Sequence, residues 1–209
     1  MRTKARVLGL AVGAIVAVAA TMDLAVGAGP EAGGATPAFT VGPSSAASAS
    51  GRPRPLILEG SSAPSRLSMR PSGRRFVVLE SPGGIGDLGE RCTTVSPTAQ
   101  RCRVGNITYI GLRSFGGRDQ IRATDGVQTQ LAVLGGKGRD VIAGGGGGDG
   151  LDGGPGPDRV IGRSGGDLLR GNAANDRLSG GPGDDTVNGG PGRDRCGGGP
   201  GADLITRCP

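Results

Sequence analysis

The chain has 209 residues, and its 45 glycines, 15 prolines, three Phe, one Tyr and no Trp exclude a large conventional core, because aromatic side chains fill much of such cores. Histidine is absent, which removes the usual general base, the Ser-His-Asp triad and the commonest zinc ligand. The net charge is +6, but residues 135–206 have a net charge of −2, so the remainder carries +8.

Residues 1–28 are typical of a secretory signal peptide. Arg2, Lys4 and Arg6 form a positive start, residues 7–20 are apolar, and small residues offer cleavage after Ala20 or Ala28. The alternative is an uncleaved membrane anchor, but the apolar run is short for a span of about 20 residues. We therefore expect cleavage and export by the general secretory route.

Residues 29–75 are rich in Ala, Pro, Ser, Gly and Thr. Such a composition buries too little apolar surface to offset the entropy of ordering, so we expect a disordered linker. A stalk that spans a cell wall or carries glycans is the functional alternative.

Residues 76–134 contain the first strand signals. Residues 76–79 and 107–110 are apolar and β-branched, and a turn at residues 81–84 ends the first of these strands. Residues 116–121 resemble half of the nine-residue repeat of residues 135–206, with Asp119 and Ile121 in register, and a three-residue insertion comes after them. We predict that this β segment caps the repeat region, which begins near Gly105. The tripeptide Asn106-Ile107-Thr108 is a glycosylation sequon.

One nine-residue phrase occurs eight times in residues 135–206 without a change of register. Glycine recurs at positions one, two and four, which allows left-handed backbone angles and close approach of main-chain atoms. Position six is always aspartate and position eight always apolar. The first six residues therefore form a turn and the last three a short strand with one buried face. The aspartates are Asp140, Asp149, Asp158, Asp167, Asp176, Asp185, Asp194 and Asp203.

This phrase resembles the RTX, or haemolysin-type, calcium-binding nonapeptide repeat. The resemblance implies an all-β fold, a right-handed parallel β-roll in which two phrases make one coil and calcium lies between stacked turns. It also implies that all eight aspartates bind Ca²⁺. One edge would hold Asp140, Asp158, Asp176 and Asp194, and the opposite edge Asp149, Asp167, Asp185 and Asp203. Because the core side chains are small and the tract is rich in glycine, we predict that folding is coupled to calcium binding.

Several phrases depart from the ideal. Phrase four carries Arg163 and Ser164 and phrase five lacks its inner glycines, so their sites are expected to be weaker; Arg139 and Arg193 should lower affinity by repulsion.

A glycine-rich linker and a metal-free solenoid are the alternatives, which eight in-phase aspartates disfavour. The segment 162–166 matches G-x-S-x-G, but it lies in phase with the repeat and no base accompanies it.

The four cysteines allow three pairings, and proximity in sequence favours Cys92 with Cys102 and Cys196 with Cys208. The second bridge would join the last strand to the tail, residues 207–209. Disulfides fit an oxidising exterior.

The sequence thus predicts a secreted, non-enzymatic calcium-binding module of the cell exterior. Its basic surplus suggests anionic wall polymers or other extracellular surfaces as partners, without specific nucleic-acid binding or stable membrane insertion. The alternatives are a calcium-dependent adhesin, or a hydrolase or toxin to which such repeats are attached.

Overall fold

A computed structural model describes residues 39–41, 54–83, 85, 88, 92–105 and 107–209. The predicted signal peptide, most of the predicted linker's first half and the sequon's Asn106 lie outside these residues. The described residues contain strands and no helix. Accordingly, the described part of the chain offers no helix that could span a membrane.

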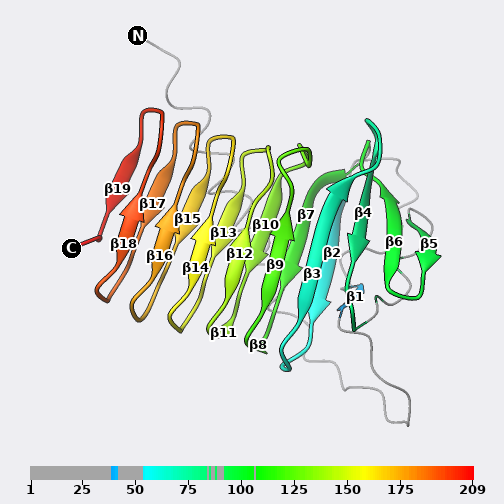
Figure 1. The fold of residues 1–209 in the computed structure, drawn as a ribbon, viewed down its shortest axis with the longest axis horizontal. Coiled ribbons are helices and arrows are strands. Elements are labelled where there is room, and N and C mark those ends of the chain that lie inside the picture. Colours follow the sequence, from blue (N-terminus) through cyan, green and yellow to red (C-terminus); the bar gives the residue numbers. More distant parts are fainter. Residues whose placement is uncertain (1–38, 42–53, 84, 86–87, 89–91, 106) are drawn as a thin grey trace.

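The repeat region is a parallel β-solenoid, as predicted, with coils stacked side by side along the molecule (Figure 1). Each 18-residue coil places one strand in each of two sheets, so that every strand pairs with the strand 18 residues away in parallel register. The strands of the repeat are β12 (Val141–Ala143), β13 (Gly150–Asp152), β14 (Arg159–Ile161), β15 (Leu168–Arg170), β16 (Arg177–Ser179), β17 (Thr186–Asn188), β18 (Arg195–Gly197) and β19 (Leu204–Thr206).

Position eight fills the interior between the two sheets. Ile142, Leu151, Val160 and Leu169 are fully buried, and they belong to one continuous apolar cluster. The row ends at Ile205 in the last coil, which is 44% exposed because no further coil covers it. The prediction that position eight is buried is therefore confirmed from β12 to β17, and Ala143 in β12 and Leu168 in β15 are buried as well.

The roll begins earlier in the chain than predicted. Strands β2 (Arg54–Gly60) and β3 (Arg66–Pro71) pair in parallel with β7 (Ile107–Arg113) and β9 (Gln120–Ala123), and these pair with β10 (Leu131–Leu134) and β12. The expectations of a disordered linker up to residue 75 and of a start near Gly105 are thus wrong for residues 54–71. Leu56, Leu58, Leu67 and Met69 alternate into the core, a two-residue period that the surrounding Pro, Ser and Arg residues obscured.

Antiparallel strands cover the first coil at its outer side. Strand β1 (Phe39–Val41) pairs with β2, while β4 (Phe76–Glu80), β6 (Ala99–Arg103) and β5 (Cys92–Ser96) extend the other sheet beyond β3. A third, two-stranded sheet joins β8 (Gly116–Gly117) to β11 (Lys137–Gly138). Residues 76–103 thus supply strands that protect the edge of a coil that sequence analysis did not detect, whereas β7, β9 and β10 of the segment expected to cap the roll belong to its parallel coils.

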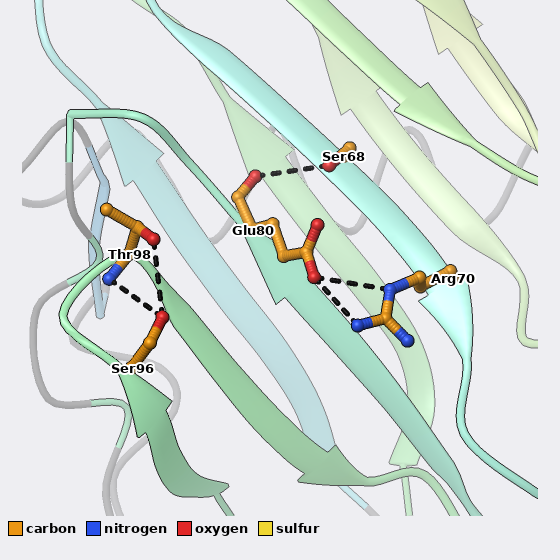
Figure 2. Close-up of polar contacts among 5 residues, drawn as sticks. All are labelled: Ser68, Arg70, Glu80, Ser96 and Thr98. Carbon is orange, nitrogen blue, oxygen red and sulfur yellow. Dashed lines mark hydrogen bonds and ion pairs between the residues drawn. The ribbon is translucent and has the colours of Figure 1, made fainter.

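Polar contacts fasten the cap strands together (Figure 2). The guanidinium of Arg70 donates from two nitrogens to Glu80 Oε1, at 3.2 and 2.8 Å, and the Ser68 hydroxyl donates to the Glu80 carbonyl. In the turn after β5, the Thr98 backbone N–H donates to Ser96 Oγ at 3.3 Å. These contacts are exposed, so they fix the strand register more than they add stability.

Both predicted disulfides are present. Cys92–Cys102 joins directly paired residues of β5 and β6, and Cys196–Cys208 ties the inward side of β18 to the tail after β19. The second bridge closes the end of the roll that lacks antiparallel cover.

We predict that the variant Cys196→Val with Cys208→Ala keeps the fold but loosens the last coil. Hydrogen exchange of the β18 and β19 amides should become faster, because a bridge that closes a short loop contributes about 2–3 kcal/mol. Removing Cys92 and Cys102 is the control, and it should leave those amides unchanged. Equal exchange rates in wild type and variant would refute this role.

Candidate calcium-binding ladders

The position-six aspartates form two ladders, one at each edge of the roll. Ladder I comprises Asp119, Asp140, Asp158, Asp176 and Asp194, and ladder II comprises Asp149, Asp167, Asp185 and Asp203. In each step, the backbone N–H of one aspartate donates to Oδ1 of the aspartate one coil later, at 2.7–3.0 Å. The predicted division of the eight aspartates between two edges is thus observed.

The ladder side chains point into the molecule. All members of ladder I are at most 6% exposed, as are Asp149, Asp167 and Asp185 of ladder II. Asp203, in the last coil, is partly exposed. Burial of this many carboxyl groups at regular spacing requires compensation, because an unpaired buried charge costs several kcal/mol.

In six ladder members, only one of the two carboxylate oxygens receives that compensation from the protein. In Asp140, Asp158, Asp176 and Asp194, Oδ2 is buried and has no hydrogen-bond partner among the described residues. The same holds for Oδ2 of the two inner ladder II members, Asp167 and Asp185. Six buried oxygen atoms are therefore available to a cation.

Main-chain oxygens lie beside these carboxylates. In phrases 153–206, the backbone hydrogen bonds between coils, other than those within the strand pairs, are accepted by carbonyls of positions one, three, six and nine. The carbonyls of positions two and four in these phrases accept none of these bonds. At Gly192, the point where a Cβ would sit lies 1.9 Å from the Ala174 carbonyl oxygen and 3.1 Å from Asp194 Oδ1. Carbonyl and carboxylate oxygens thus line the same space between turns, and glycine leaves it open.

The first glycine of each phrase also leaves open the space around the carboxylate oxygens. A Cβ at Gly144 would lie 2.3 Å from Asp149 Oδ2 and 2.5 Å from the Gly162 carbonyl oxygen. No group of three or more His, Cys, Asp or Glu side chains suited to a metal occurs among the described residues. A cation here would be held mainly by one or two carboxylates and several carbonyls, a hard-oxygen set that fits Ca²⁺.

The protein itself closes the N-terminal end of each ladder. Asp119 accepts bonds from the Ser65 backbone N–H at Oδ1 and from the Ser114 hydroxyl at Oδ2. Asp149 accepts bonds from the Leu131 N–H at Oδ1 and the Gly145 N–H at Oδ2. Asp119 was absent from the predicted ligands, although its phrase carried the repeat's Asp and apolar positions. Asp149 was among them, yet both of its oxygens have protein partners.

The three-residue insertion packs against the run of glycines, residues 144–148, that opens the second phrase. Val127 O accepts the Gly146 N–H, and a Cβ at Gly146 would lie 2.2 Å from the Asp125 carbonyl oxygen. The inserted loop therefore packs directly on this turn. Arg163, at φ 81°, reaches back to form a 2.6 Å ion pair with Asp125, so the irregular fourth phrase fastens the same loop.

Burial raises the pKa of seven ladder carboxyl groups, those of Asp119, Asp140, Asp149, Asp158, Asp167, Asp176 and Asp185. It raises the pKa of Asp140 and Asp176 to about 6, of Asp149 and Asp158 to about 7, and of Asp167 to about 8. Hydrogen bonds from backbone N–H groups oppose the shift, and neighbouring carboxylates add to it in Asp140, Asp158, Asp167 and Asp176. The uncharged state is thus favoured when no cation is bound.

The family comparison agrees with this geometry. The model of the RTX calcium-binding nonapeptide repeat (four copies) matches residues 133–160, 161–196 and 170–205. No match was found among curated proteins or among solved structures. The matched residues, which form the solenoid and its aspartate ladders, are thus RTX calcium-binding nonapeptide repeats, and repeats of this family bind calcium ions.

We predict opposite effects for two substitutions at position four. Gly156→Ala should destabilise the calcium-loaded roll by more than about 1 kcal/mol, because Gly156 has φ 139° and its Cβ would lie 1.5 Å from the Gly138 carbonyl oxygen. Ala174→Gly should stabilise it by about 1 kcal/mol, because Ala174 has φ 97°. Denaturant unfolding measures both. The control Gly197→Ala, where nothing lies within 4 Å, should change little.

We also predict that without calcium the roll is more stable in mild acid. Because the folded-state pKa values exceed the ordinary value of about 3.9, the folded chain binds more protons, and the free energy of unfolding falls as pH rises from about 4 to 8. Circular dichroism in chelator should show a larger folded fraction at pH of about 5 than at about 8. Apparent calcium affinity should rise over the same range. A folded fraction that increases with pH would contradict this account.

Proposed function

We propose that this chain is a secreted protein whose roll folds as Ca²⁺ binds at the ladders and which serves as a non-catalytic binding or structural module outside the cell. The observation that carries the proposal is the set of six buried aspartate Oδ2 atoms without partners. A folded roll without cations would retain these uncompensated groups, so binding energy becomes folding energy.

The metal ligands that we propose are the predicted aspartates, with unequal roles. The six aspartates with a free Oδ2 are the principal carboxylate ligands, together with carbonyl oxygens of positions two and four. Asp203 is the outermost ligand of ladder II. Asp149 contributes less, because the Gly145 N–H occupies its Oδ2.

Secretion is supported by the positive start and apolar run of residues 1–20, and by two disulfides that require an oxidising compartment. Extracellular calcium modules bind with dissociation constants of about 10⁻⁴–10⁻³ M. Folding would therefore follow exposure to the calcium-rich exterior. The absence of His from the sequence and of free cysteines from the described residues supports a role without catalysis.

The adjacent residues Asp184 and Asp185 provide a matched test. Asp185→Asn should lower the number of bound calcium ions and raise the calcium concentration needed for folding, because Asp185 is buried with a free Oδ2. Asp184→Asn removes the same charge at an exposed residue, whose Oδ1 accepts the Ala202 N–H, and should change neither. Mass spectrometry gives the stoichiometry and circular dichroism the folding.

The proposal would be overturned if millimolar calcium left the dichroism spectrum unchanged and calorimetry detected no binding. Equal calcium stoichiometry in Asp185→Asn and Asp184→Asn would instead exclude the ladder as the place of binding.

A further inference from the structure

Three arginines form a row on the outer face of the sheet that contains β14, β16 and β18. Arg159 pairs directly with Arg177, and Arg177 with Arg195. All three are exposed. Neighbouring strands lie about 4.8 Å apart, so the row extends about 10 Å along the roll axis. Like charges directly opposite each other destabilise a sheet, so fold stability does not account for the row.

Three further arginines at position five extend the row into a groove. Arg118, Arg139 and Arg193 are exposed, and all six arginines line one groove that crosses the successive coils. From the coil of β9 to that of β18 there are four strand spacings, or about 20 Å. We call this surface the arginine groove.

The charge of the arginine groove is not neutralised by neighbouring side chains. None of the six arginines forms an ion pair with a described residue; the pairs Arg70–Glu80 and Arg163–Asp125 lie outside the groove. The acidic side chains that line the groove are ladder I members, which point inward and are buried. Bound calcium would balance their charge, and the outward face would then present six guanidinium groups.

We propose that the arginine groove binds a linear polymer of phosphate diesters without bases when calcium is loaded. The guanidinium fork binds phosphate oxygens in a bidentate manner, and a phosphate has oxygens for two neighbouring arginines. A compact anion would reach only part of a groove of this length, whereas a chain can follow it across the coils. No aromatic residue lines the groove, so it offers no platform for stacking bases.

This assignment rests on the proposed calcium function, and it names the chemistry of the exterior partner. It also links the calcium ladders to the arginine groove. Calcium both orders the coils that bring the arginines into register and balances the carboxylates beneath them, so binding of the polymer should depend on calcium.

The test uses a fluorescein-labelled oligomer of abasic deoxyribose phosphates, measured by fluorescence anisotropy with the full chain in millimolar calcium. We expect binding that weakens with salt and disappears in chelator. Arg177→Gln should weaken binding and lower the slope of log affinity against log salt by about 1. Arg159→Gln and Arg195→Gln should act similarly. Arg74→Gln, an equal charge change outside the groove, should leave affinity almost unchanged.

Three outcomes would overturn the assignment. The first is that the arginine-groove variants bind the oligomer with wild-type affinity. The second is that a polyglutamate of the same charge binds as tightly as the oligomer, and the third is that a single-stranded DNA of the same length binds much more tightly. The dichroism titration is run on the same samples. Calcium-induced folding without binding of the oligomer refutes the groove alone. Binding that depends on Arg177 without any calcium response refutes the proposed function and retains the groove.

Discussion

The hydrogen bond from one ladder aspartate's backbone N–H to the next aspartate's carboxylate is the interaction on which the structure depends. It joins successive coils of the repeat at both edges and places a carboxyl group in the interior once per phrase. Because the bond uses Oδ1 only, the second oxygen needs another partner. Glycine at positions one and four leaves space for such a partner, because a Cβ at these glycines would collide with carboxylate or carbonyl oxygens.

The two ends of the roll satisfy their carboxylates in different ways. At the N-terminal end, hydroxyl and backbone N–H groups bond both oxygens of Asp119 and Asp149, and antiparallel strands cover the sheet edge. At the C-terminal end no coil comes after β19, and the disulfide to Cys208 restrains the last turns. Six ladder members between these ends have a buried Oδ2 without a hydrogen-bond partner among the described residues. Under the proposed function, calcium would supply in the middle of the roll the compensation that protein groups supply at its N-terminal end.

The period of two that defines a strand also separates the charges. Position six points inward and carries the aspartates, while positions five and seven point outward and carry the arginines. Carboxylate and guanidinium groups thus lie close in sequence without forming ion pairs. This separation leaves the carboxylates free for a cation and the guanidinium groups free for an anion. A single repeat can therefore provide two kinds of binding surface.

The sequence by itself determined that position eight of each phrase is apolar and position six is aspartate, because eight unbroken phrases keep both in register. The resemblance of the phrase to the RTX repeat implied the parallel solenoid and its two aspartate edges, which the structure shows. Both disulfides were also predictable from proximity along the chain. Only the tertiary structure showed the coil made by β2 and β3. The alternation of apolar and polar residues in these strands is weak in the sequence, and it is recognisable as a buried face only because β7 and β9 pair with them. Likewise, only the stacked coils distinguish Asp149, whose oxygens are both bonded, from Asp158, because the partners of a buried carboxylate come from residues distant in sequence.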